Sequence, residues 1–369
     1  MTLSAAVSAV CCNSPRIPGK TMNHDSTSAK LLPPDRPLMD SLGRVHTSVR
    51  LSVTDRCNLR CTYCMPEIDA TFMARDHLLT FEELHRLTEL LVTRCGINDV
   101  RLTGGEPLVR RELDCFVAML SKIAGLTDLS LTTNGILLPA QAEKLKAAGL
   151  KRLNISIDTL DREQFKKLAR RDSLDETIAG IEAAIRCGFE SIKLNAIAIK
   201  GITEHEFVSL IEFAAAKGVV IRFIEFMPLD FDRAWQRDSV LSGDRLLKLI
   251  EQHFGPLNEQ PRQTPSQPAE QFRLPEGGRF AGAEIGIIRS VSQPFCQACN
   301  RLRITADGSI RNCLFARDES PIRDLIRSGA SDDTLVQVIR DCVWQKKPSH
   351  GIDSDGFSPP PRAMYSIGG

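Results

Sequence analysis

Two groups of three cysteines are the residues of this sequence whose types and spacing could do chemistry. The first group has CxxxCxxC spacing, and the second has a CxxC pair followed by thirteen residues and a third cysteine. The six are Cys57, Cys61, Cys64, Cys296, Cys299 and Cys313. Three thiolates can hold a four-iron cluster while its fourth iron stays open to a small molecule. Zinc sites usually close with four protein ligands, so both triads favour open iron–sulphur clusters.

Zinc remains the alternative for each triad if a distant fourth ligand completes the site. It is the more serious alternative for Cys296 and Cys299, because CxxC pairs are common in zinc knuckles. No second CxxC pair or nearby histidine completes a zinc ribbon there. A second open cluster is therefore the better interpretation.

The composition predicts a globular protein that does not bind a partner through its overall charge. The chain has 369 residues, of which 42% are apolar and 25% charged, and 47 basic residues oppose 46 acidic ones. A net charge of +1 argues against a nucleic-acid or membrane-surface protein, so any anion site must be local. The apolar stretches fall short of the roughly 20 residues that span a bilayer. Cysteines that are grouped as metal ligands rather than paired as disulfides indicate a reducing compartment. We therefore expect a cytoplasmic protein.

The first 45 residues are expected to form a mobile extension. They contain five prolines, and no basic residue precedes the mildly apolar run Leu3 to Cys12, as a secretory signal requires. A transit peptide would need more arginine than Arg16 supplies, which leaves an organelle address as a minor alternative.

From Thr47 onward, short β-branched runs alternate with amphipathic helical stretches, the pattern of a parallel sheet covered by helices. Six strands are expected, near residues 49–53, 99–103, 128–132, 152–156, 191–199 and 220–226. Helices are expected at 80–95, 111–124, 140–148, 174–186, 204–217 and 242–253. Such units predict an incomplete (β/α)6 TIM-like barrel, whose chemistry gathers at the carboxyl ends of its strands. An open doubly wound sheet stays possible.

The alternating pattern stops at a polar, proline-containing stretch, residues 255–270, which we interpret as a surface connection between domains. We therefore predict a barrel domain over residues 46–254. A smaller domain over residues 255–369 would carry the second triad, a strand at 285–291 and a helical stretch at 335–343.

The segment CNLRCTYCMP, residues 57–66, resembles the signature of radical S-adenosylmethionine (SAM) enzymes, in which an aromatic residue precedes the third cysteine. The resemblance implies that the open iron chelates the amino and carboxylate groups of SAM. The GGEP turn after the second strand looks like the family's methionine-binding segment, where glycine permits close backbone approach. The residues that the resemblance assigns to SAM are Tyr63, Gly105, Ser156 and Met227.

The segment FCQACNRLRITADGSIRNCLF, residues 295–315, resembles the second-cluster region of the GTP 3',8-cyclase family of molybdenum cofactor biosynthesis. It implies two 4Fe-4S clusters, the second binding the guanine base of GTP through its open iron. The residues that match substrate positions or could meet the triphosphate are Arg50, Arg101, Thr132, Lys193, Arg301, Leu302 and Arg303. Lys193 also stands out alone, because it interrupts an apolar strand, and a buried lysine is costly without an anion.

The chain ends in Gly368 and Gly369, which resemble the family's diglycine tail. By composition the tail, residues 349–369, would be called disordered. The resemblance implies instead that the tail enters the active-site cavity, where glycine backbone can thread past cofactor and substrate. We expect it to exclude water and position the substrate.

The expected activity is therefore a radical SAM lyase that cyclises GTP. A radical from SAM would remove the hydrogen from C3' of GTP, and C3' would bond to C8. The resemblance also implies a homodimer, and a cyclic pyranopterin monophosphate synthase that consumes the product. Two alternatives stay open: a peptide-modifying radical SAM maturase with an auxiliary cluster, and a zinc-stabilised binding module without catalysis.

Overall fold

The structure, a computed structural model, describes residues 37–68 and 70–369. They belong to one compact unit. Most of the expected N-terminal extension lies outside the described residues. Residues 37–45, which we had assigned to that extension, are folded: Leu38 is fully buried, and its amide donates to the carbonyl of Cys95 over 3.1 Å.

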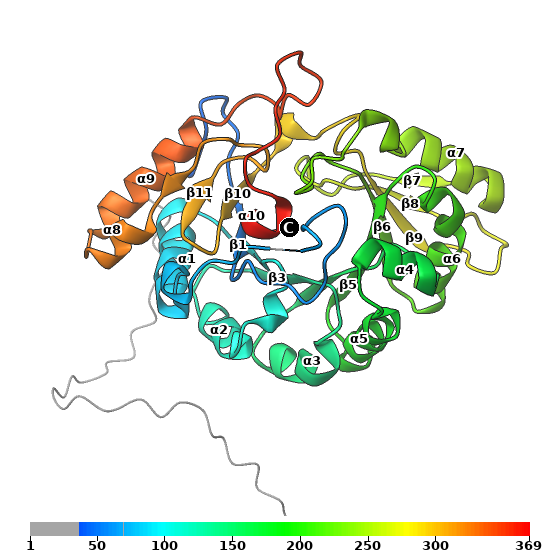
Figure 1. The fold of residues 1–369 in the computed structure, drawn as a ribbon, viewed down its shortest axis with the longest axis horizontal. Coiled ribbons are helices and arrows are strands. Elements are labelled where there is room, and N and C mark those ends of the chain that lie inside the picture. Colours follow the sequence, from blue (N-terminus) through cyan, green and yellow to red (C-terminus); the bar gives the residue numbers. More distant parts are fainter. Residues whose placement is uncertain (1–36, 69) are drawn as a thin grey trace, which may run out of the picture. The chain divides into compact units, whose positions relative to one another are not determined.

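Six parallel strands are hydrogen-bonded in the order in which they occur along the chain. They are β1 (Ser48–Ser52), β2 (Asp99–Thr103), β3 (Asp128–Thr133), β4 (Arg152–Ser156), β5 (Ser191–Ala198) and β6 (Val220–Glu225). Figure 1 shows them as an arc with helices on its outer side. A doubly wound sheet reverses its strand order at a switch point. The order within β1 to β6 never reverses, so the predicted partial barrel is confirmed.

The outer helices begin and end largely where local patterns place them. They are α1 (Phe81–Cys95), α2 (Leu113–Leu120), α3 (Leu138–Ala147), α4 (Arg162–Ala169), α5 (Leu174–Cys187), α6 (Thr203–Ala216) and α7 (Gly243–Phe254). In α1, the Thr80 side chain accepts from the Glu83 amide and Glu83 accepts from the Thr80 amide, while Gly96 ends the helix in a left-handed conformation. Helix α4 was not expected.

The C-terminal region extends the same sheet at both edges. Strand β9 (Glu284–Ile288) pairs parallel with β6, and β10 (Arg301–Ile304) pairs parallel with β1. Antiparallel strands complete the edges: β7 (Asn258–Gln260), β8 (Glu270–Arg273), β11 (Ser309–Arg311) and β12 (Ser320–Pro321). The sheet has twelve strands, with β12 and β7 at its unjoined edges.

The stretch 255–270 differs from the expected surface connection, because it holds β7 and leads into β8. These strands are short and polar, as edge strands often are, so their composition conceals them. The predicted division at residue 254 stays a prediction.

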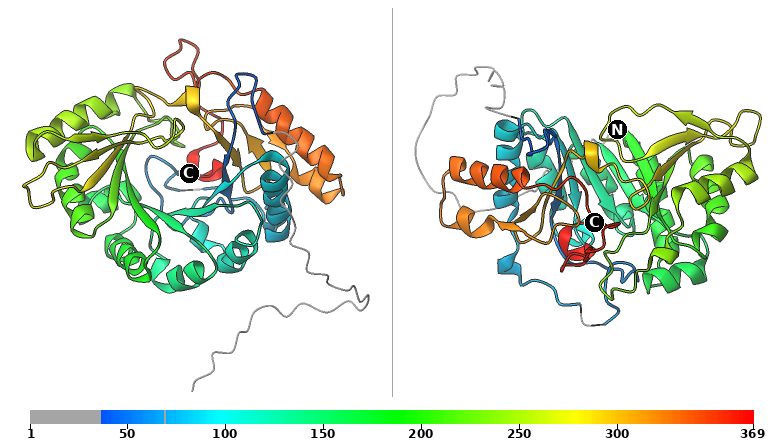
Figure 2. Two further views of the ribbon diagram at one scale, coloured as in Figure 1. Left: turned by 180° about the vertical axis from the view of Figure 1, so that it is seen from behind. Right: turned by 90° about the horizontal axis from the view of Figure 1, so that it is seen from above.

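The remaining helices are short, except for one that packs beside α1. They are α8 (Arg323–Arg327), α9 (Asp332–Trp344) and α10 (Met364–Ile367), with 3-10 turns η1 (Arg75–His77), η2 (Pro107–Val109), η3 (Arg237–Ser239) and η4 (Cys296–Ala298). Figures 1 and 2 show α10 and the C-terminus inside the arc of strands. Among the described residues, no helix is long and apolar enough to cross a membrane.

The core lies between the sheet and its outer helices, and alternation along the strands leaves the inner face polar. In β1, Val49 and Leu51 are fully buried in the core, whereas Arg50 between them points to the opposite face. The inner face of the barrel is thus available for a charged site.

Candidate active site

The first cysteine triad lies on the loop that follows β1. Backbone hydrogen bonds anchor this loop to the end of α4: the amide of Arg60 donates to Ala169 over 3.0 Å, and that of Thr62 to Leu168 over 2.9 Å. The amide of Cys64 closes a turn onto the Cys61 carbonyl at 2.9 Å. All three cysteines carry free thiols. The unexpected helix α4 therefore holds the loop in place.

The surroundings of this triad fit a metal cluster. Burial raises the pKa of Cys57 to about 12, and burial followed by the charge of Cys57 raises that of Cys61. The pKa of Cys64 is raised by burial and by both other thiols. Three neighbouring buried thiolates repel one another unless a cation binds them, and metal ligation deprotonates thiols. A cluster with iron supplies that cation.

The GGEP turn packs directly against the triad loop. A side chain on Gly104 would lie 2.6 Å from the Thr54 carbonyl oxygen, and one on Gly105 would lie 2.5 Å from that of Arg56. The amide of Gly105 donates to Thr54 over 2.8 Å. We had attributed these glycines to the approach of a ligand. The structure gives a further reason, since only glycine lets the turn meet the loop backbone this closely.

Two carboxylates near the triad were missed from the sequence. Glu106 is buried and accepts from the amides of Leu108 and Asn134 and from the Thr133 hydroxyl. Burial nevertheless raises its pKa to about 7. Asp158 accepts from the Tyr63 hydroxyl over 2.5 Å. The GGEP and IDTL segments after the strands were the only signals for these carboxylates.

The other residues matched to SAM lie at the same end of the barrel. Ser156 ends β4 and is in register with Asn195 of β5. Met227 follows β6 and packs against a small apolar cluster, which consists of Leu229, Val291, Phe315, Ile352 and Ile367. These positions surround the loop end of the barrel, where parallel strands direct their chemistry.

The second triad lies on the loops flanking β10 and β11. The Lys346 ammonium donates a hydrogen bond to Cys299, with Nζ 3.3 Å from Sγ. Burial opposes ionisation of Cys299, but Lys346 and then Arg301 outweigh it and lower the thiol pKa. Thiolate is the form that ligates metal, so Cys299 is suited to bind a cluster, whereas burial raises the pKa of Cys296. In the described part of the chain, no three His, Cys, Asp or Glu side chains are arranged to hold a single metal ion.

A cationic cavity of about 210 Å³ opens inside the barrel. Four of the predicted substrate cations line it, and the structure adds two more, so the lining cations are Arg50, Arg101, Arg152, Lys193, Arg222 and Arg301. Asp99 is the one acidic residue that lines it. Strand register explains the gathering, because Arg50 pairs with Arg101 on one side and with Arg303 on the other.

The charges in this cavity destabilise one another. Burial lowers the pKa of Arg50, and Arg303 and Arg101 lower it further. Burial followed by Arg222 lowers the pKa of Lys193 to about 8. Among the described residues, neither Arg50 nor Lys193 forms a salt bridge, so no carboxylate neutralises either charge by direct contact.

Sequence reasoning missed Arg222, although it carries the signal that identified Lys193, a cation within an apolar strand. Its guanidinium donates to Asn195 over 2.9 Å and 2.7 Å and to Asn154 over 2.5 Å. These amides fix its orientation without neutralising it. Arg152 differs, because Asp128 pairs with it.

Three predicted substrate residues lie outside the cavity lining. Leu302 points into the core, because it alternates with Arg301 and Arg303 along β10. Thr132 is in register with Asn154, one of the partners of Arg222. Arg303 is buried beside the cavity and donates to the carbonyl of Gly368.

The C-terminal tail is ordered inside the barrel. The amide of Gly369 lies 3.5 Å from the Gly104 carbonyl, and a side chain on Gly368 would lie 2.6 Å from the Thr103 hydroxyl. The backbone of Tyr365 donates to Cys64 and favours its thiolate. The tail therefore contacts the GGEP turn, the first triad and Arg303.

Comparisons with known proteins agree with this arrangement. The sequence model of the Radical SAM superfamily matches residues 51–214, and that of Molybdenum Cofactor Synthesis C matches residues 219–352. The second match begins at residue 219, immediately before β6 and well before the domain boundary that we predicted.

Relatives named GTP 3',8-cyclase are similar to this chain over most of its length. The one from Rhodopirellula baltica is 58% identical over 332 residues, covering 90% of this chain and 92% of the relative. The one from Mycolicibacterium smegmatis is 44% identical over 344 residues, covering 93% of this chain and 95% of the relative.

Among solved structures, Streptococcus suis SuiB bound to S-adenosylmethionine has a similar fold. Its TM-score is 0.55 at 13% sequence identity, and the match covers 84% of this chain and 66% of that one. At this identity the similarity concerns the fold alone.

Proposed function

Because this chain belongs to the GTP 3',8-cyclase family of radical SAM enzymes, we propose that its cationic cavity binds the triphosphate of GTP. The reaction is the conversion of GTP into (8S)-3',8-cyclo-7,8-dihydroguanosine 5'-triphosphate, the first step of molybdenum cofactor biosynthesis. The nucleoside then extends from the cavity toward the second triad and the tail.

The observation that carries the proposal is a cavity lined by six buried or partly buried cations but by only one acidic residue, Asp99. GTP brings about four negative charges, and charge-assisted hydrogen bonds from arginine suit phosphate oxygens. Asn154 and Asn195 hold Arg222 in a fixed orientation, so little side-chain entropy is lost on binding. A bound triphosphate would offset the cost of burying the charges of Lys193 and Arg50.

The chain uses SAM and two 4Fe-4S clusters. Cys57, Cys61 and Cys64 would hold the first cluster, and the second triad would hold the second cluster, which would supply an open iron to the guanine base. When bound, the first cluster and SAM supply the radical that removes the hydrogen from C3' of GTP. Tyr63, Gly105, Ser156 and Met227 would contact SAM.

The chain's own residues orient and shield the reactants. Arg301 lines the cavity and is near enough to Cys299 to lower its pKa, and its guanidinium lies 4.4 Å from the centre of the Phe295 ring. This position suits a contact with phosphate or base. The diglycine tail, seated against the GGEP turn, would exclude water and stray hydrogen donors and hold the ribose for attack.

Several finer features rest on the family and are proposed with the function. They are a homodimeric assembly, a cytoplasmic location, an external one-electron donor and a cyclic pyranopterin monophosphate synthase that acts on the product. No nucleic acid or membrane partner is proposed.

The proposal is tested with anaerobically reconstituted enzyme, reductant, SAM and GTP deuterated at C3'. We expect cyclised nucleotide and transfer of the deuterium to 5'-deoxyadenosine. Arg222→Met should weaken GTP binding by roughly 1.5 to 3 kcal/mol, the range for hydrogen bonds to charged groups. Arg245→Met on the outer helix α7 is the matched control, because that arginine is exposed. Equal effects of both variants, or unlabelled 5'-deoxyadenosine, would overturn the assignment.

A further inference from the structure

Two buried arginines stand directly opposite each other on β10 and β11. Arg303 and Arg311 are register partners, with exposed fractions of 4% and 0%. Like charges placed directly opposite in an antiparallel pair destabilise it, and burial increases the cost. Each arginine therefore needs a partner that offsets its charge.

The two arginines are compensated from different parts of the chain. Arg311 pairs with Glu319 and also donates to the carbonyls of Leu314 and Ala316, on the loop that follows Cys313. Arg303 instead donates to the carbonyl of Gly368 in the tail. Arg311 thus depends on the loop that follows Cys313, and Arg303 depends on the tail.

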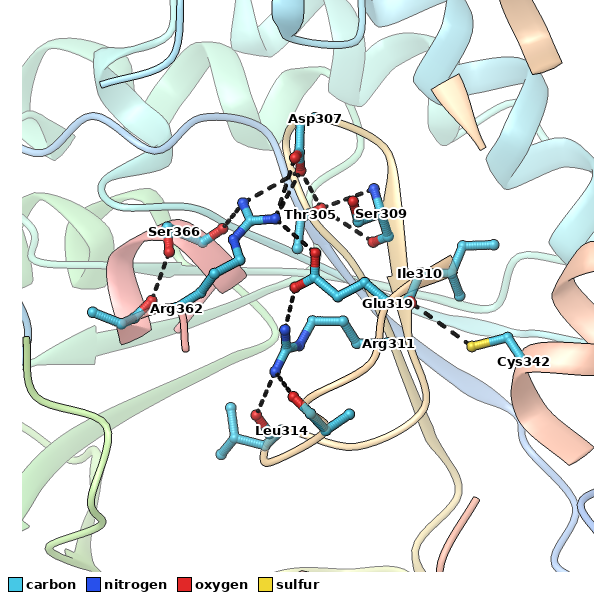
Figure 3. Close-up of polar contacts among 12 residues, drawn as sticks. Thr305, Asp307, Ser309, Ile310, Arg311, Leu314, Glu319, Cys342, Arg362 and Ser366 are labelled. Atoms are coloured by element: carbon cyan, nitrogen blue, oxygen red, sulfur yellow. Dashed lines mark hydrogen bonds and ion pairs between the residues drawn. The ribbon is translucent and has the colours of Figure 1, made fainter. Parts of the chain in front are cut away.

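Arg362 joins these two sides, as Figure 3 shows. Its Nη1 lies 3.0 Å from Oε2 of Glu319 and 3.2 Å from Oδ2 of Asp307. Its Nη2 donates to the Ser366 carbonyl over 2.8 Å. Glu319 is shared, since its other oxygen pairs with Arg311.

These ion pairs are well shielded from solvent. The side chains of Arg362, Glu319 and Asp307 are 20%, 19% and 24% exposed. Networks of shielded, multiply bonded charges hold geometry better than isolated surface pairs, which contribute little. Apolar contacts also stabilise the position of the tail, because Ile367 is 1% exposed and packs in the same cluster as Phe315.

We propose that Arg362, Asp307 and Glu319 form a latch that seats the C-terminal tail and thereby positions Arg303 for the substrate. Arg362 is a positioning residue: it fixes α10, α10 fixes the Gly368 carbonyl, and that carbonyl directs the Arg303 guanidinium. The latch also ties the tail to the loop of Cys313. The proposal rests on the proposed function of the tail and of Arg303.

The latch is tested in the fully reconstituted enzyme by hydrogen–deuterium exchange of residues 364–369. Arg362→Met should raise their exchange rates at least about tenfold, equivalent to 1.4 kcal/mol. Asp307→Asn, a milder change, should raise them in the same direction. Arg317→Met is the matched control, because Arg317 is exposed on the loop after Cys313. Iron content should equal that of the wild type in all three variants.

The same samples are assayed for 5'-deoxyadenosine and cyclised nucleotide. Both latch variants should release more 5'-deoxyadenosine per cyclised product, with the control unchanged. Unchanged tail exchange in both variants would overturn the latch. Faster exchange with an unchanged product ratio would overturn its positioning of Arg303. If the wild type makes no cyclised nucleotide, the proposed function fails, while the exchange measurement still decides whether the latch holds the tail.

Discussion

Lys193 should make GTP affinity depend on pH in a range where arginines do not titrate. Burial and then Arg222 lower its pKa from 10.5 to about 8, so about half of the free enzyme carries the neutral amine at that pH. A bound triphosphate favours the ammonium instead and raises this pKa. Binding therefore takes up a proton, and affinity must fall as pH rises through 8.

The magnitude follows from the fraction of ammonium in the free enzyme. With a pKa of about 8, that fraction is about nine-tenths at pH 7 and about one-tenth at pH 9. If the bound pKa lies well above 9, GTP affinity should fall about tenfold between these pH values. Anaerobic equilibrium dialysis with radiolabelled GTP measures it directly.

Three controls make the measurement specific to Lys193. Guanosine has the same base but no phosphates, so its affinity corrects for titration of the base. Lys193→Arg should abolish the dependence, because guanidinium stays charged throughout this range. Arg222→Met should shift the midpoint upward by removing a neighbouring charge. A flat wild-type profile, or the same slope for guanosine, would refute this account of the cavity.

The remaining predictions concern the clusters, the cations and the tail. Reconstituted protein should hold roughly eight irons per chain, as iron analysis would measure. Cys57→Ala should abolish SAM cleavage, whereas Cys313→Ala should chiefly destroy GTP binding. If 5'-deoxyadenosine assays showed the opposite pattern, the roles of the two clusters would be reversed. Lys193→Ala, Arg301→Ala and Arg303→Ala should each weaken GTP binding by roughly 1.5 to 3 kcal/mol but affect guanosine much less, and equal losses for both ligands would count against phosphate contacts. Gly368→Ala should unseat the tail, because φ there is +82° and the added carbon would lie 2.6 Å from the Thr103 hydroxyl; left-handed backbone alone costs about 1–2 kcal/mol for alanine. Cyclised product per 5'-deoxyadenosine should then fall at constant iron content, and an unaltered ratio would argue against a role for the tail.

The sequence predicted the parts of the fold that depend on local patterns. Strands β1 to β6 and most outer helices follow from periodicity and capping, as Thr80 and Glu83 illustrate. Strand β10 could not be found this way, because its pairing with β1 joins residues about 250 positions apart. Edge strands such as β7 are too short and polar to show a pattern.

The candidate site was predictable where a residue type was unusual for its place. Lys193 and the cysteines met that condition, and so did Arg222, which we overlooked within its apolar strand. Arg362 carried no local signal. Its importance comes from Asp307 and Glu319, which are 55 and 43 positions away and meet it only through the fold.

The pairing of β10 with β1 also has a consequence for how the chain is made. During synthesis β1 leaves the ribosome first, but the strand that covers its outer edge follows some 250 residues later. At the usual rate of roughly 5 to 20 residues per second, that edge stays open for about ten to fifty seconds. An unpaired strand edge invites pairing with other chains. Newly made chains should therefore be most prone to aggregate, and most dependent on chaperones, until their last seventy residues emerge.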